Sequence, residues 1–243
     1  MTDINMETWE LSDTAAFAKY GEVFVPRRDE QMRVVVDLLA NVPAGDVLEV
    51  CCGEGKLAEL YLRENAGRRV TVMDGSAEML LMANARLSAL GGNRHGTIQA
   101  DIVDTSWRTP NTYAGVMSSL AVHHLDGPGK QTLYRDIHEM LVPRGVFVLA
   151  DLVEPTSVRS RDVAGDAWQA AVERGSQEKF GGDEATRAFE ATEWNYYRYP
   201  DPLDQPSSVV DNIDWLRGAG FQDVDIVWMY AGHAVFTATK ESR

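Results

Sequence analysis

Carboxylates and glycines recur where short apolar runs end, and this spacing suits the binding of a nucleotide. The apolar run at residues 47–50 passes into a turn that carries Gly53 and Gly55 and then into a helix-periodic segment. Glycine lets the backbone N–H groups of such a turn approach a ligand, because a Cβ atom would obstruct it. Asp74 ends the next apolar run, at the distance expected for a carboxylate that binds ribose hydroxyls. The pattern predicts a nucleotide pocket at one edge of a parallel sheet.

Two adjacent histidines, His123 and His124, follow a later apolar run and are the candidates for proton transfer. Imidazole titrates near neutral pH, which suits a general base at the point where a substrate meets a cofactor. The alternative is that the pair only shapes its loop through hydrogen bonds. The sequence does not separate His123 from His124 in this role.

The two cysteines of the chain, Cys51 and Cys52, are adjacent, which is no disulfide framework. Adjacent cysteines also lack the two-residue gap that lets both thiolates bind one zinc ion. We therefore predict no metal site and expect Cys51 to pack against the cofactor.

Hydrophobic periodicity places these residues in an alternating order of strands and helices. Ser76 is the predicted N-cap of the helix that follows Asp74. Strands are predicted at residues 46–50, 69–73, 97–100, 113–120, 146–151, 221–230 and 233–239. We expect an α/β fold with a doubly wound, mostly parallel seven-stranded sheet that ends in an antiparallel hairpin.

A length of 243 residues fits one Rossmann-like domain over residues 1–243. We expect an N-terminal cap and first helix over residues 1–42 and a helical lid insertion over residues 155–205, because long insertions between core elements are usually functional. Aromatic side chains gather late in this insertion and could line a substrate pocket or anchor the lid to the core. The candidate substrate residues are Tyr20, Arg28, Trp194, Tyr197, Arg198 and Tyr199.

The net charge of −14 and the pI near 4.7 disfavour a broad phosphate-binding face, so a nucleic-acid partner is not expected. The sequence contains no run of about 20 apolar residues, so no membrane span is expected. The first residues have neither a basic region nor an apolar core of a signal peptide, so we expect a cytoplasmic protein. The sequence predicts no oligomeric state.

Five segments, in order, resemble the class I S-adenosylmethionine-dependent methyltransferases, in particular the small bacterial type. They are EVCCGEG at 49–55, MDGSAEML at 73–80, ADI at 100–102, SSLAVHHL at 118–125 and LVPRG at 141–145. The family usually has glycine at the position of Cys51. Each segment alone is weakly specific, but five segments in the order of the family make a strong resemblance.

The resemblance implies S-adenosyl-L-methionine as cofactor and a role for each matched residue. Glu49 would organise the loop around the methionine amino group, and Asp74 would bind both ribose hydroxyls. Asp101 and Ile102 would lie by the adenine. The remaining implied contacts are the loop glycines Gly53 and Gly55, the adenosine neighbours Gly75, Ser76 and Met79, and the methionine-end segment Ser118, Ser119 and Leu120.

The expected function is methyl transfer to a small-molecule acceptor at oxygen, nitrogen or carbon. Residues 53–58 also satisfy the dinucleotide pattern G-x-G-x-x-A, but Glu49 would place negative charge beside a pyrophosphate. The alternatives within the resemblance are a tRNA-modification enzyme, a carboxy-S-adenosylmethionine synthase-like protein and a non-catalytic cofactor-binding subunit.

Overall fold

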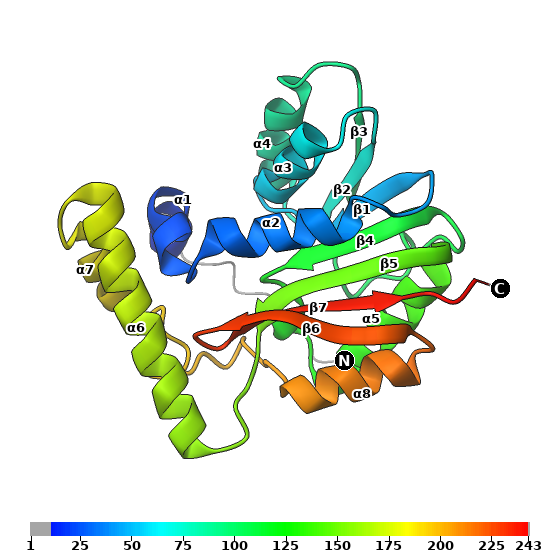
Figure 1. Ribbon diagram of the computed structural model, residues 1–243. Coiled ribbons are helices and arrows are strands. Elements are labelled where there is room, and N and C mark those ends of the chain that lie inside the picture. Colours follow the sequence, from blue (N-terminus) through cyan, green and yellow to red (C-terminus); the bar gives the residue numbers. More distant parts are fainter. Residues whose placement is uncertain (1–10, 243) are drawn as a thin grey trace, which may run out of the picture.

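A seven-stranded sheet forms the centre of the molecule (Figure 1). The structure, a computed structural model, describes residues 11–242 and, within them, all side chains except those of residues 11–15 and 18. The strand order is β3-β2-β1-β4-β5-β7-β6, and only the β5–β7 and β7–β6 pairs are antiparallel. The predicted fold class is therefore confirmed. The strands are β1 (Asp46–Val50), β2 (Val70–Asp74), β3 (His95–Gln99), β4 (Tyr113–Ser119), β5 (Leu141–Leu152), β6 (Gln222–Tyr230) and β7 (His233–Thr239).

Helices cover both faces of the sheet, as a doubly wound fold requires. On one face α2, α3 and α4 bury apolar side chains such as Leu39, Leu57 and Ala83 against the central strands. On the other face α5 and α8 do the same with Ile137 and Leu216. The helices are α1 (Leu11–Phe24), α2 (Arg28–Leu39), α3 (Lys56–Glu64), α4 (Ala77–Ser88), α5 (Gly127–Met140), α6 (Val158–Phe180), α7 (Glu184–Ala191) and α8 (Val209–Gly218), with a 3₁₀ turn η1 (Val122–His124).

Side-chain caps fix where several helices begin. A serine or aspartate oxygen accepts a backbone N–H of the first turn, which would otherwise lack a partner. Ser76 caps α4 in this way, as predicted. Within residues 11–242, Asp126 at α5, Ser157 at α6 and Ser208 at α8 cap their helices in the same way.

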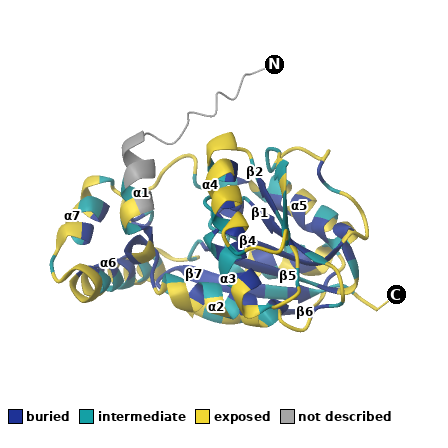
Figure 2. Cartoon of the chain, turned by 90° about the horizontal axis from the view of Figure 1, so that it is seen from above, coloured by how far each residue is buried: buried dark blue, intermediate teal, exposed yellow. Residues whose placement is uncertain are grey.

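A separate group of helices, α1, α6 and α7, stands beside the edge where the parallel strands end (Figures 1 and 2). Its own apolar cluster includes Phe24 of α1, Trp168 of α6 and Phe189 of α7. Both α6 and α7 belong to the insertion expected at residues 155–205. The expected N-terminal cap at 1–42 contributes α1 and α2, while its residues 1–10 lie outside the described part of the chain.

Strand β5 begins earlier than the sequence predicts, at Leu141 instead of residue 146. Leu141 pairs with Tyr113 and Val146 with Gly115, so residues 142–145 form an irregularity in the ladder. Pro143 lies there, where no ladder hydrogen bond is required of it. Pro143 therefore marks a bulge within β5 rather than a turn before the strand.

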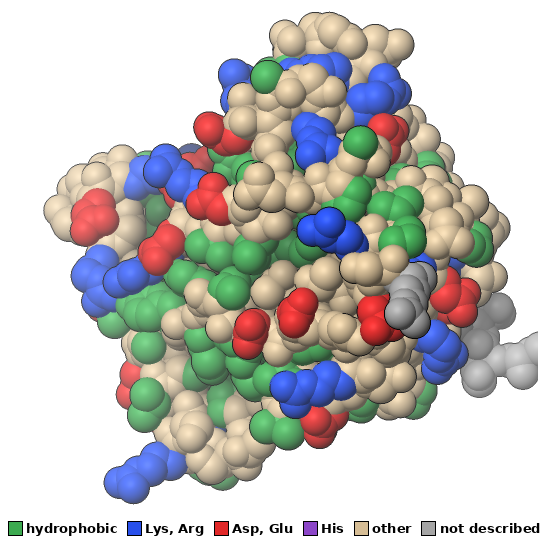
Figure 3. All heavy atoms as spheres, turned by 45° about the vertical axis from the view of Figure 1, so that its right-hand side comes forward, with side chains coloured by type: hydrophobic (Ala, Val, Ile, Leu, Met, Phe, Trp, Pro, Cys, Tyr) green, Lys and Arg blue, Asp and Glu red, His purple; other side chains and the backbone are tan. Residues whose placement is uncertain are grey.

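The surface carries mixed charge. On the face drawn in Figure 3, lysine and arginine side chains lie scattered among acidic and apolar ones rather than gathered in one continuous area. Over residues 11–242, no helix is long and apolar enough to cross a membrane.

Candidate functional site

The turn after β1 is held by the carboxylate at the end of β2. Asp74 Oδ2 accepts the Gly53 N–H at 2.9 Å, and its Oδ1 accepts the Ser76 N–H at 2.9 Å. Each carboxylate oxygen has two acceptor positions, so one position per oxygen is left. Asp74 can therefore fix the turn and still accept two hydroxyl groups of a ligand.

Glycine stands at the two positions of this turn for different structural reasons. Gly53 has φ +52°, and nothing lies within 4 Å of the place where its Cβ atom would be. This side of the turn is open to a ligand. Gly55 has φ +75°, and a Cβ atom there would lie 2.9 Å from Cβ of Ala83 in α4. The close approach of α4, rather than of a ligand, requires glycine at this second position.

Glu49, on β1, is buried and only partly satisfied. Burial raises the pKa of its carboxyl to about 8, although Arg28 and a backbone hydrogen bond at Ala58 act in the opposite direction. Its Oε2 is buried and has no hydrogen-bond partner in the described structure. Buried polar atoms without partners are rare in folded proteins, so this oxygen is an acceptor that is free to pair with a donor.

Cys51 adopts the backbone that glycine would supply. Its φ is +56°, a left-handed conformation that a side chain disfavours by about 1–2 kcal/mol. Burial raises the pKa of both thiols well above the usual range, and Cys52 Sγ donates to the Gly53 carbonyl. The pair is therefore present as thiols at neutral pH, which disfavours thiolate chemistry.

The other expected cofactor residues lie along the same edge of the sheet. Asp101 and Ile102 lie just beyond the end of β3, after Ala100, and Asp101 Oδ1 accepts the Val103 N–H at 3.0 Å. Ser118, at the end of β4, donates from its hydroxyl to the Val50 carbonyl. Gly75 and Ser76 form the turn into α4, and Met79 lies in the first turn of that helix. Leu120, at φ +56°, turns the chain out of β4.

Arg28 joins this edge from α2. Its guanidinium donates to Ser119 Oγ at 2.5 Å. Burial lowers the pKa of Arg28 to about 10, while the nearby carboxylates Glu49 and Asp151 act to raise it. The side chain therefore stays cationic at neutral pH, at the ends of β1, β4 and β5.

The two candidate histidines meet two carboxylates that the sequence analysis missed. Asp151, near the end of β5, accepts from His123 through both the backbone N–H (2.9 Å) and Nδ1 (2.5 Å). Asp204, in the loop before α8, lies 3.4 Å from His123 Nε2 and 3.1 Å from His124 Nδ1. Burial lowers the pKa of His123, but the carboxylates of Asp151 and Asp204 outweigh it and raise the pKa to about 10.

Of these two missed carboxylates, only Asp151 could have been predicted from the sequence. Asp151 ends a predicted strand, as Asp74 does, so its place at the edge could have been found. Asp204 lies among prolines of the insertion and has no pattern that points to the histidines.

The candidate substrate residues are not gathered around one point. Trp194 stacks on Phe17, with ring centroids 5.1 Å apart, and Tyr20 packs on Phe24 within the α1–α6–α7 cluster. Tyr197 is buried, and its hydroxyl donates to the carbonyls of Val153 and Gly232. Arg198 pairs with Asp166 at the surface, and Tyr199 is exposed. Of the six, only Arg28 is hydrogen-bonded to an expected cofactor residue, Ser119.

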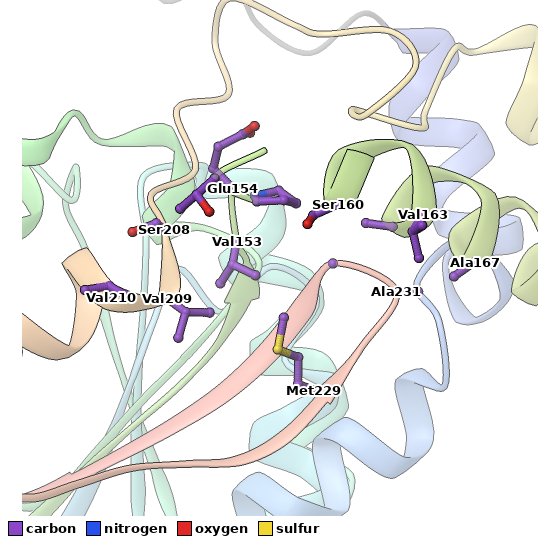
Figure 4. Close-up of a pocket in the computed structure, with 14 residues that line it drawn as sticks. Val153, Glu154, Ser160, Val163, Ala167, Ser208, Val209, Val210, Met229 and Ala231 are labelled. Atoms are coloured by element: carbon purple, nitrogen blue, oxygen red, sulfur yellow. The ribbon is translucent and has the colours of Figure 1, made fainter. Parts of the chain in front are cut away.

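A pocket of about 420 Å³ opens between the start of α6, the start of α8 and the turn of the β6–β7 hairpin (Figure 4). Its lining is largely apolar and includes Val153, Val163, Val209 and Met229. None of the expected cofactor residues lines it. Pattern analysis of the sequence did not predict this pocket.

Comparisons with known proteins agree with the fold and the glycine turn. A family model described as a methyltransferase domain matches residues 47–145. A trans-aconitate 2-methyltransferase of Rhodopseudomonas palustris is 26% identical over 83% of this chain and 79% of its own length. A protein of the same name from Paracidovorax citrulli is 33% identical over 59% of this chain and 55% of its own length.

Among solved structures, an O-methyltransferase family protein from Burkholderia thailandensis superposes with a TM-score of 0.67. The identity is 14%, and the alignment covers 94% of this chain and 60% of that one. This likeness concerns the fold. The matched domain model and the named relatives, together with this fold, support a class I S-adenosylmethionine-dependent methyltransferase.

Proposed function

We propose that this methyltransferase acts on a small carboxylate-bearing molecule and methylates one of its oxygens. Two curated relatives are named for trans-aconitate, a small tricarboxylate. The observation that carries the proposal is Arg28, a cation held among the ends of β1, β4 and β5 by Ser119 and by the carboxylates around it. A guanidinium at such a place suits an anionic acceptor, because its planar fork matches a carboxylate.

We assign cofactor binding to the residues around the glycine turn. The two acceptor positions left on Asp74 fit two ribose hydroxyls, and the unpaired Oε2 of Glu49 fits the methionine ammonium group. The open side of Gly53 leaves room for the ligand between them. The other proposed contacts are Cys51, Gly55, Gly75, Ser76, Met79, Asp101, Ile102, Ser118, Ser119 and Leu120.

When bound, S-adenosylmethionine supplies a methyl group on a sulfonium, which an acceptor can displace in line. The residues of this chain then have to hold the acceptor oxygen in near-attack geometry, which alone supplies much of the rate. A carboxylate acceptor arrives without the proton that a general base would remove. We therefore assign His123 and His124 to positioning the acceptor at the end of β4.

We assign residues 155–205 to a lid within a single domain and residues 1–42 to a cap that joins it. The aromatic contacts of Trp194 and Tyr197 support a lid that is anchored to α1 and to the hairpin. These two residues, with Tyr20, are then lid-packing residues, while Arg198 and Tyr199 remain accessible at the surface.

The test has two stages. First, the melting temperature is recorded with and without S-adenosylhomocysteine, because a ligand that binds only the folded state must raise it. Second, S-adenosylhomocysteine release is measured with a panel of small mono-, di- and tricarboxylates and with matched alcohols and amines. Turnover confined to carboxylates, and lost in Arg28→Ala, is expected. A thermal shift without turnover on any carboxylate would contradict the acceptor class.

A further inference from the structure

The side chains of His123, His124 and Asp204 converge on one point near the end of β4. Each offers one ligand atom, and these atoms all lie within 4.8 Å of one another. We propose that the three side chains bind a divalent metal ion such as Zn²⁺. Sequence analysis predicted no metal site because Cys51 and Cys52 are adjacent, and it did not consider Asp204, which is distant from the histidines along the chain.

The two distances from Asp204 to the histidine nitrogens fit a small ion. Bonds of about 2.0–2.1 Å to a tetrahedral zinc ion place neighbouring ligand atoms about 3.3 Å apart. Asp204 Oδ1 lies 3.4 Å from His123 Nε2 and 3.1 Å from His124 Nδ1. Two imidazoles and one carboxylate form a ligand set that leaves coordination positions open.

The ring of His123 is oriented as in established metal sites. A metal-bound histidine usually donates its second ring nitrogen to a carboxylate, which fixes the ring and its tautomer. Asp151 accepts from Nδ1 of His123 at 2.5 Å, so Nε2 is the nitrogen directed at Asp204. Asp151 is itself fixed, since it also accepts the backbone N–H groups of His123 and Leu152.

The loop that carries Asp204 is anchored to the core directly after this residue. The Gln205 N–H donates to the His123 carbonyl at 2.7 Å. The ammonium group of Lys130 donates to the Gln205 carbonyl and to Ser207 Oγ. These bonds hold the carboxylate against the histidines before any ion binds, and such preorganisation is what a metal site needs.

The ion would serve the acceptor, and this step rests on the proposed function. A carboxylate oxygen is a suitable ligand for an open position on the ion. Together with Arg28, the ion would give the acceptor two fixed points of attachment. The competing interpretation is a metal-free contact in which Asp204 pairs directly with the two histidines.

The test measures metal binding itself. The whole protein is treated with a chelator, dialysed and titrated with Zn²⁺, and separately with Co²⁺, whose visible absorption reports its ligand geometry. The variants are His124→Ala and Asp204→Asn, because His123 is buried against Asp151 and its removal threatens the fold. Asp201→Asn, an exposed acid of the same loop whose amide keeps the acceptor for the Leu203 N–H, is the matched control.

We expect one Zn²⁺ per chain, visible Co²⁺ bands, and affinity about 100-fold weaker or worse in His124→Ala and Asp204→Asn but unchanged in Asp201→Asn. Native protein that binds Zn²⁺ no more tightly than Asp204→Asn would overturn the proposal and leave the metal-free contact. The thermal shift with S-adenosylhomocysteine is measured on the same samples. Its absence would contradict the assigned cofactor contacts without bearing on the metal result.

Discussion

Replacing Asp74 with alanine should weaken both the fold and the binding of the cofactor. In the free protein the change removes two carboxylate hydrogen bonds, to the N–H groups of Gly53 and Ser76. Hydrogen bonds to charged groups contribute about 1.5–3 kcal/mol each, and the partial exposure of this site favours the lower value. We therefore expect a loss of about 3 kcal/mol in the free energy of unfolding, or about 6–12 °C in melting temperature for a chain of this size.

The effect on binding should be separable from the effect on stability. Two hydroxyl contacts of similar strength correspond to about 3 kcal/mol, which is about a 100-fold rise in the dissociation constant of S-adenosylhomocysteine. Isothermal titration at 15 °C, where the variant stays folded, measures this constant. Ser208→Ala is the control, because it removes the N-cap of α8 at a cost of about 1 kcal/mol and touches no cofactor residue. An Asp74→Ala protein that binds within threefold of the native protein would refute the ribose contact.

Three further outcomes are expected. Burial raises the pKa of Glu49 to about 8, so below that pH its carboxyl group must lose a proton before it pairs with an ammonium group. Binding of S-adenosylhomocysteine should therefore release a proton. Its affinity should rise by up to about tenfold per pH unit between pH 6 and pH 8. Titration calorimetry in two buffers detects the proton, and a slope that survives in Glu49→Gln would exclude this residue as its source. Tyr197→Phe should lower the free energy of unfolding by about 1–3 kcal/mol in urea denaturation, because the carbonyls of Val153 and Gly232 lose a buried donor; an unchanged midpoint would mean that water replaces the hydroxyl. Cys51→Gly should stay within about 1 kcal/mol of the native stability, whereas Cys51→Val should lose about 2 kcal/mol or more at φ +56°, and equal loss in both would contradict backbone strain.

Local patterns predicted the elements of the sheet well. Strands β1 and β7 have the predicted bounds, and Ser76 caps α4 as expected. These features depend on alternation, on glycine and on a capping oxygen within three residues, all of which are visible in a short window of sequence. The early start of β5 was missed for the same reason, since a proline within a bulge looks the same in sequence as one in a turn.

The arrangement around His123 could not be predicted in this way. Asp151 is 28 residues further along the chain, and the contact between them depends on the pairing of β4 with β5. Asp204 arrives from the insertion, and its position depends on Lys130 and Gln205. A carboxylate in a polar loop belongs to no periodic pattern, so the sequence does not indicate which side chain it contacts.

The family match and the acceptor edge therefore depend on different parts of the chain. The matched domain ends at residue 145 and begins at residue 47, so it contains the glycine turn, Asp74 and both histidines. Arg28 precedes it, while Asp151 and Asp204 follow it. We propose that these three residues supply the charge around the acceptor. On that proposal, a relative that shares only the matched domain would share the proposed cofactor residues and need not share the acceptor. For this reason the acceptor is to be sought through Arg28 and Asp204, by the variants above, rather than through the names of relatives.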